Sequence, residues 1–180
     1  MSAGSIIVLA FLAFVAITIF KGVRIVPQGY KWIVQRLGKY HTTLGPGLNF
    51  VIPYIDEVAY KVTTKDIVLD IPSQEVISRD NAVLLMNAVA YINLTTPEKA
   101  VYGIENYTWA IQNMVQTSLR SIVGEMDLDD ALSSRDHIKA KLKAAISDDI
   151  ADWGITLKTV EIQDIKPSHT MQTAMEEQAA

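Results

Sequence analysis

The chain has 180 residues, contains no cysteine and carries a net charge of −4. Its length allows one compact domain or two small subdomains and excludes a large multidomain enzyme, and the lack of cysteine excludes disulfides, thiolate zinc sites and cysteine nucleophiles. Residues 1–55 hold five basic residues and no acidic one, whereas the rest of the chain holds 11 basic and 20 acidic residues, a balance that argues against a nucleic-acid-binding body.

The chain starts with a long apolar segment. No charged residue occurs from Ala3 to Phe20, and most residues of this stretch are Ile, Leu, Val or Phe. As a helix the segment is about 27 Å long, which just spans the apolar core of a bilayer. A cleaved signal peptide is the alternative, but it needs basic residues before the apolar core, and Met1–Ser5 has none. We therefore predict a transmembrane anchor over residues 1–21.

Basic residues cluster directly after this anchor. The five are Lys21, Arg24, Lys31, Arg36 and Lys39. Because positive flanks stay on the cytoplasmic side, the sequence predicts a single-pass protein of the cell membrane whose domain faces the cytoplasm. Lys21 and Arg24 are candidate contacts with the membrane interface, and attraction to anionic lipid is a further expectation.

The first part of the domain is predicted to be rich in strands. A turn at Val26–Gly29 leads into a strand over Tyr30–Leu37. After Gly45-Pro46-Gly47, the apolar stretch Leu48–Ile55 is interrupted by Pro53, so it is predicted to be an ordered loop and not a regular strand.

Two interpretations of this apolar loop remain open. It either covers the core beneath the sheet, or Leu48, Phe50, Val51 and Ile52 dip into the membrane interface beside the anchor. Both interpretations can hold in part, and the four residues join Lys21 as candidate interface contacts.

Alternating apolar residues predict further strands. Two half-buried strands lie within residues 58–71, where Pro72 closes the second, and a long strand that is apolar on both faces follows over Ala82–Leu94. A last strand, Ile155–Ile165, has an apolar phase that slips between Leu157 and Val160, as a bulge would produce.

Helical spacing dominates the second half. Thr96 and Thr108 are predicted caps of two helices, and a third helix carries apolar residues from Ile138 to Trp153 at helical spacing. Pro167 is predicted to start a final helix that continues beyond this chain. The three tryptophans, Trp32, Trp109 and Trp153, are expected in the core.

The predicted fold class is α+β, with antiparallel strands in the first half and mixed helix and strand in the second. The predicted segments are an anchor at 1–21, a β-rich subdomain at 22–95, a helical subdomain with one strand at 96–166, and the start of a C-terminal helix at 167–180.

No catalytic, cofactor or metal site is predicted. The histidines His41, His137 and His169 fall in different elements without ligand spacing, and no phosphate loop or nucleophile motif occurs. A membrane-tethered hydrolase that uses Ser78, Asp80 and His137 remains an alternative, provided that the fold brings these residues within hydrogen-bond reach.

Short motifs in a fixed order resemble the SPFH (Band 7) family of the stomatin/prohibitin type, particularly its bacterial stomatin-like branch. The motifs are Val26-Pro27-Gln28-Gly29-Tyr30, Arg36-Leu37-Gly38-Lys39, Gly45-Pro46-Gly47-Leu48, Ile52-Pro53, Asp70-Ile71-Pro72-Ser73-Gln74-Glu75-Val76, Ser78-Arg79-Asp80-Asn81, Ser118-Leu119-Arg120, Trp153-Gly154-Ile155 and Val160-Glu161-Ile162-Gln163-Asp164-Ile165. The resemblance spans nearly the whole chain.

This resemblance implies a non-enzymatic, homo-oligomeric scaffold that organises membrane microdomains and modulates membrane proteins or their quality control. It implies the lipid bilayer as a partner, assembly through a C-terminal coiled-coil region absent from this chain, and partners such as a membrane protease or an NfeD-like protein. A regulatory binding module for a channel or protease is a further alternative.

Overall fold

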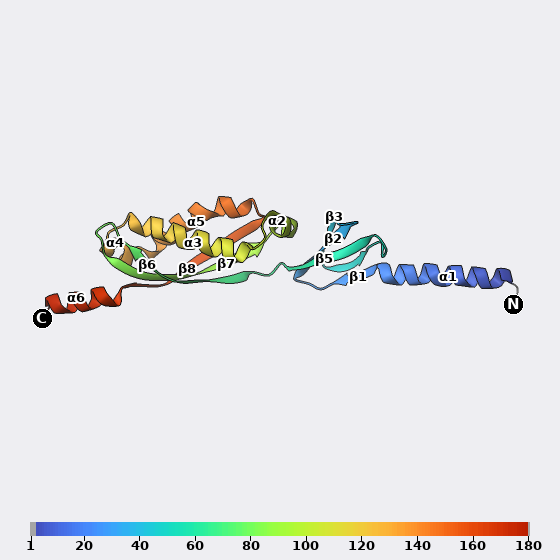
Figure 1. Cartoon of the computed structure of the whole chain (residues 1–180), viewed down its shortest axis with the longest axis horizontal. Helices are drawn as coiled ribbons and strands as arrows, with labels where there is room; N and C mark the ends of the chain where they lie inside the picture. Colours follow the sequence, from blue (N-terminus) through green and yellow to red (C-terminus); the bar gives the residue numbers. More distant parts are fainter. Residues whose placement is uncertain (1–2, 180) are drawn as a thin grey trace. The chain divides into compact units, whose positions relative to one another are not determined.

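The computed structural model describes residues 3–179 and divides into two compact units, Met1–Lys65 and Asp66–Ala180 (Figure 1). The first unit holds the N-terminal helix and two small antiparallel sheets, and the second holds one three-stranded antiparallel sheet and the remaining helices. The predicted α+β class is confirmed.

The first unit is built from one helix and five strands. In chain order they are α1 (Ala3–Gly22), β1 (Val23–Val26), β2 (Tyr30–Arg36), β3 (Lys39–Leu44), β4 (Gly47–Phe50) and β5 (Asp56–Thr63). Strands β1 and β4 form one sheet, and β2 lies between β3 and β5 in the other. A two-residue turn joins β2 to β3, with positive φ angles at Leu37 (50°) and Gly38 (81°) that suit a tight hairpin.

The core of the first unit is small. Val26, Val34, Leu44 and Val51 form a buried cluster, and Trp32 and Val58 pack against it. These residues come from β1, β2, β3, the segment after β4, and β5, so the cluster connects both sheets.

The second unit is a sheet with helices on one face (Figure 1). Its elements are β6 (Ile67–Ile77), β7 (Val83–Leu94), α2 (Pro97–Gly103), α3 (Tyr107–Gly124), α4 (Leu128–Ser133), α5 (Arg135–Ala151), β8 (Ile155–Pro167) and α6 (His169–Ala179). Strand β7 lies in the centre and pairs with β6 and β8. Alternate residues of β7 are fully buried, and α3 and α5 bury residues at helical spacing, among them Ile111 and Val115 on α3 and Ile138 and Leu142 on α5.

The two compact units divide the chain at a different point from the predicted subdomains. The sequence prediction placed residues 66–95 in the β-rich first subdomain, whereas the two compact units divide between Lys65 and Asp66. The reason is strand pairing, because β6 and β7 form one sheet with β8, which lies more than 60 residues further along the chain.

Several predicted element ends are also corrected. Strand β6 continues past Pro72 to Ile77, because a register shift between Ile71 and Gln74 lets the proline sit outside the regular ladder. Pro167 is the last residue of β8, and α6 begins at His169. The predicted bulge in β8 is confirmed, since the register shifts where Tyr91 pairs with Thr159 and Ile92 pairs with Leu157.

One tryptophan contradicts its predicted burial. Trp109 on α3 is 64% exposed, whereas Trp32 and Trp153 are half-buried. The cap of α3 is also different from the prediction: the Asn106 side chain accepts a hydrogen bond from the Trp109 backbone N–H at 3.0 Å, and Thr108 lies inside the helix.

Candidate membrane interface

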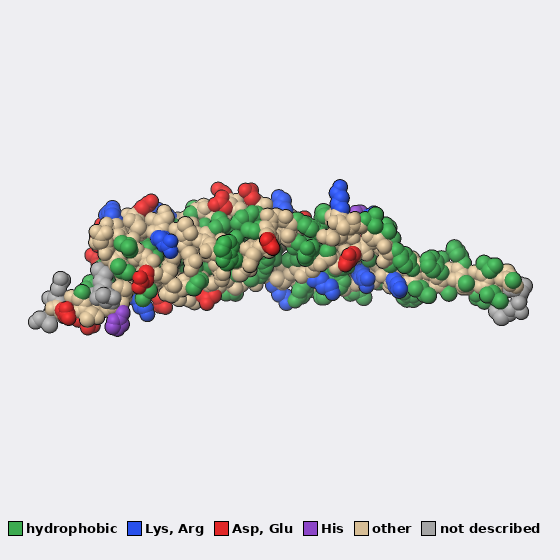
Figure 2. All heavy atoms as spheres, viewed as in Figure 1, with side chains coloured by type: hydrophobic (Ala, Val, Ile, Leu, Met, Phe, Trp, Pro, Cys, Tyr) green, Lys and Arg blue, Asp and Glu red, His purple; other side chains and the backbone are tan. Residues whose placement is uncertain are grey.

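Helix α1 is long and apolar enough to cross a membrane. Its 20 residues, Ala3–Gly22, contain an 18-residue window with a mean hydropathy of 2.7, and none of that window is buried within the structure. Among the described residues it is the only helix with these properties. Figure 2 shows apolar side chains along α1 and basic side chains near its C-terminal end.

The chain passes directly from α1 into a two-stranded ribbon, β1–β4, with an exposed apolar face. Val23 pairs with Phe50, and Ile25 pairs with Leu48, so all four side chains lie on the same face. We call Val23, Ile25, Leu48 and Phe50 the ribbon face. Ile25 is 69% exposed, Leu48 77% and Phe50 60%, although strand side chains this apolar are normally buried.

The opposite face of the ribbon belongs to the core. Val26 is buried in the cluster of the first unit, and Val51, which follows β4, is buried in the same cluster. The two interpretations of the apolar stretch are therefore divided between its residues: Val51 covers the core, and Leu48, Phe50 and Ile52 are exposed. The structure also replaces the first part of the predicted loop, Leu48–Ile55, with strand β4 (Gly47–Phe50), because Pro53 lies beyond the paired residues.

The ribbon is attached closely to the end of the helix. The backbone N–H of Val51 donates to the carbonyl oxygen of Gly22 at 2.8 Å. A Cβ atom at Gly22 would lie 2.7 Å from both the Phe50 ring and the Val51 carbonyl oxygen, which is closer than real Cβ contacts allow. Glycine is therefore required at the junction for the ribbon to reach the helix.

Tyr54 extends this surface back along the anchor. Its ring stacks on Phe14, with centroids 6.3 Å apart, and its hydroxyl lies 3.5 Å from the Thr18 hydroxyl. Phe14 lies eight residues before the end of α1, which is about 12 Å along the helix axis. Tyrosine suits the membrane–water boundary because its ring is apolar and its hydroxyl is polar. Sequence reasoning missed Tyr54, although an aromatic residue directly after Pro53 was its available signal.

An ion pair fixes the loop that carries Tyr54. The Arg36 guanidinium donates to both carboxylate oxygens of Asp56, at 2.6 and 3.0 Å, and Asp56 also accepts the backbone N–H of Ile52 at 3.0 Å. The Arg36 hydrogen bond, aided by the Ile52 N–H, lowers the pKa of Asp56 to about 2. Asp56 therefore stays ionised and holds the beginning of β5 to the loop.

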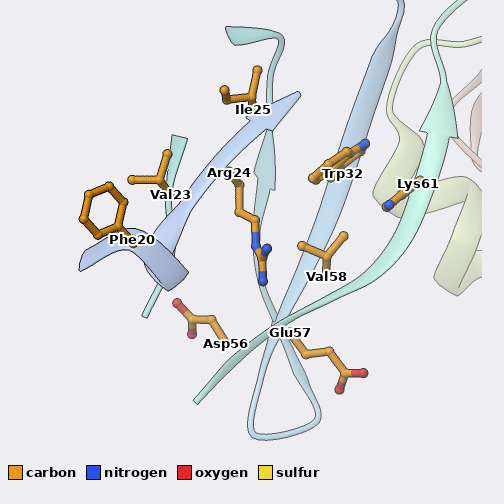
Figure 3. Close-up of a pocket in the computed structure, with 9 residues that line it drawn as sticks. All are labelled: Phe20, Val23, Arg24, Ile25, Trp32, Asp56, Glu57, Val58 and Lys61. Carbon is orange, nitrogen blue, oxygen red and sulfur yellow. The ribbon is translucent and has the colours of Figure 1, made fainter. Parts of the chain in front are cut away.

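A cavity of about 750 Å³ lies beside β1 (Figure 3). It is lined by Phe20, Val23, Arg24, Ile25, Trp32, Asp56, Glu57, Val58 and Lys61. The Arg24 guanidinium points into the space between β1 and the strands β2 and β5 (Figure 3). The Lys61 amine lies 4.5 Å from the centroid of the Trp32 ring, a cation–π distance.

Two residues of the hydrolase alternative, Ser78 and Asp80, form hydrogen bonds that stabilise a turn. The buried Ser78 hydroxyl binds Asp80 and the carbonyl oxygen of Ala82, and Asp80 accepts the backbone N–H of Leu128. The Ser78 hydrogen bond lowers the pKa of Asp80. His137 is exposed on α5, and within residues 3–179 no hydrogen bond joins it to Ser78 or Asp80. Within residues 3–179, no group of three or more His, Cys, Asp or Glu side chains is placed so that it could hold a metal ion.

An apolar helix, an apolar ribbon beside it and an α+β domain fit a membrane-associated protein. Residues 24–180 match the SPFH domain / Band 7 family, and the chain belongs to this family. Members of this family are generally membrane-associated scaffolds.

Relatives with curated names agree with this family. The chain is 40% identical over 168 residues to a stomatin homolog of Pyrococcus horikoshii, covering 93% of this chain and 63% of that protein. It is 35% identical over 153 residues to the human mitochondrial stomatin-like protein 2, covering 85% of this chain and 43% of that protein. An uncharacterised protein of Mycobacterium tuberculosis is 35% identical over 98% of this chain, which spans 46% of that relative.

Proposed function

We propose that this protein is a membrane-anchored scaffold whose first unit rests on the bilayer surface. Helix α1 spans the membrane, the ribbon face and Ile52 lie in its interface, and the second unit is on the cytoplasmic side. The observation that carries this proposal is the exposed apolar ribbon face, which the Val51–Gly22 hydrogen bond holds against the end of α1.

The scaffold assembles and acts on other proteins in this proposal. Homo-oligomers form through a C-terminal helical region, organise membrane microdomains, and modulate membrane proteins, a membrane protease or an NfeD-like protein among them. The family and the stomatin-like relatives support this part of the proposal. Native mass measurement of the full-length protein tests it, and a discrete monomer in mild detergent and in membranes would contradict it.

Site-directed spin labelling tests the membrane contact. The chain has no cysteine, so Leu48→Cys and Ile52→Cys each introduce a unique labelling site. In lipid vesicles, nitroxides at both positions should collide more often with oxygen than with a water-soluble nickel complex, because oxygen partitions into the apolar part of the bilayer.

A label on the second unit provides the control. Leu132 on α4 is also an exposed leucine, and a nitroxide at Leu132→Cys should show the water-exposed ratio. If the labels at residues 48 and 52 gave the same ratio as the label at residue 132, the ribbon would lie in water and the proposal would be wrong.

A regulatory binding module is the second candidate, and the exposed indole of Trp109 favours it. An exposed tryptophan is typical of the residues that dominate protein interfaces. Crosslinking from position 109 followed by identification of the captured membrane protein distinguishes the candidates, since a pure scaffold would capture only copies of itself.

A further inference from the structure

The cavity beside β1 combines charged, aromatic and apolar side chains at the C-terminal end of α1. Phe20 comes from the last turn of α1, and Arg24 and Ile25 come from β1. Trp32 and Lys61 come from the neighbouring strands β2 and β5. The cavity volume, about 750 Å³, is within the range of small-molecule sites.

The positive charge of Arg24 is available to a ligand. Asp56 lines the same cavity, but its two oxygens already accept from Arg36 and Ile52. Within residues 3–179 the Arg24 side chain forms no hydrogen bond or ion pair, and its guanidinium points into the cavity (Figure 3). A guanidinium binds phosphate oxygens through two parallel hydrogen bonds, so Arg24 is suited to a phosphate group.

A second cation completes the charged lining. Lys61 is this cation, and its amine lies over the Trp32 ring and is directed toward the same space as Arg24 (Figure 3). The Glu57 carboxylate is directed away from both cations (Figure 3). Two cations that face one space match a ligand that carries a phosphate group.

The apolar part of the lining distinguishes a lipid from a free phosphate. Phe20 is 80% exposed and Ile25 is 69% exposed, and both border the cavity. Free phosphate gains nothing from these side chains, whereas a phospholipid places acyl chains beside its headgroup. The end of a membrane-spanning helix also lies at the depth of lipid headgroups.

We propose that this cavity binds the phosphate-bearing headgroup of one phospholipid, with Arg24 and Lys61 contacting the phosphate. The inference rests on the membrane-spanning role of α1 in the proposed function. It adds a specific lipid site to a general membrane contact.

The fluorescence of Trp32 provides the test. In the full chain in detergent, Trp109→Phe and Trp153→Phe leave Trp32 as the only tryptophan. Short-chain phosphatidylglycerol, short-chain phosphatidylethanolamine and inorganic phosphate are titrated separately. Both lipids should change the Trp32 emission saturably, and inorganic phosphate at equal concentration should not.

Charge-matched variants localise the binding. Arg24→Gln with Lys61→Gln should weaken lipid binding at least tenfold, because both phosphate contacts are lost. Lys31→Gln with Lys39→Gln removes the same charge from the same unit outside the cavity, and its affinity should stay within twofold of the wild type.

Three outcomes would overturn the headgroup site. They are the lack of a saturable response in the wild-type chain, an equal response to inorganic phosphate, and equal weakening by both double variants. The titration is made in detergent and the spin-label measurement in lipid vesicles, so the two experiments can fail separately. If Trp32 showed no saturable response while a nitroxide at Leu48→Cys still lay in the bilayer, the headgroup site would be rejected and the membrane contact would remain.

Discussion

At the scale of single residues, Asp56 connects the sheet of the first unit to the loop that carries Tyr54. Its side chain is only 3% exposed and Arg36 is 35% exposed, so the ion pair is partly shielded from water. Partly shielded, two-bond pairs between arginine and a carboxylate contribute more than exposed ones. The pair therefore helps to hold the loop that carries Tyr54.

Replacing this carboxylate should destabilise the first unit. We expect Asp56→Asn to lower the free energy of unfolding by about 1–3 kcal/mol, because a hydrogen-bonded charge is lost. Asp56 has a pKa lowered to about 2 in the folded state, so its contribution is complete above about pH 4 and is lost as the pH falls toward 2.

Urea unfolding followed by Trp32 fluorescence measures this change. The variant should be less stable than the wild type at pH 7, and the difference should shrink below pH 4. Glu57→Gln is the matched control, since Glu57 is exposed on the same strand, and it should unfold as the wild type does at pH 7. A difference between Asp56→Asn and the wild type that persists at pH 2 would contradict the assignment to the ion pair.

Residue by residue, the interface was only partly predictable. The sequence leaves open whether Leu48, Phe50 and Ile52 cover the core or contact the membrane interface, and the structure shows their side chains exposed. Val51 was included with them but is buried, because β4 pairs with β1 and successive residues then point to opposite sides. A predicted loop has no such alternation of side chains, so the prediction does not distinguish Val51 from its neighbours.

At the scale of elements, the long segments were predictable and the short ones were not. The helical spacing in α3 and α5 and the apolar run of β7 are strong local signals. Strands β1 and β4 have four residues each and are stabilised by pairing with one another, so neither has a clear pattern alone.

The sequence-based prediction and the structure assign different residues to the N-terminal cap of α3, and substitutions can distinguish them. Asn106 accepts the Trp109 N–H, so Asn106→Ala should lower the stability of the second unit by about 1 kcal/mol. Thr108→Ala, at the position predicted from sequence, should change it by less than about 0.5 kcal/mol, because Thr108 does not cap the helix. Chemical denaturation followed by far-ultraviolet circular dichroism compares the two, and a larger effect at Thr108 would support the sequence-based cap.

At the scale of the whole molecule, the division into units depends on a contact that local patterns do not contain. The pairing of β7 with β8 brings Leu94 opposite Ile155 and places the helices α2–α5 between the two strands in sequence. Sequence periodicity identifies both strands but not their partners. The predicted boundary therefore followed the change from strand to helix near residue 95, whereas the compact units follow the strand pairing.

The two units should also differ in stability. Among the described residues, the first unit buries five apolar side chains, Val26, Ile33, Val34, Leu44 and Val51, and the second buries 28. Because hydrophobic stabilisation is roughly proportional to buried apolar area, we expect the first unit to unfold at a lower urea concentration.

Single-tryptophan variants of the full chain in detergent resolve the two transitions. Trp32 reports on the first unit, and Trp153 reports on the second, since it follows α5 and precedes β8. The Trp32 midpoint should lie below the Trp153 midpoint, and circular dichroism should show two steps. Coincident midpoints would mean that the two units unfold as one cooperative structure, and this result would contradict the predicted difference in stability.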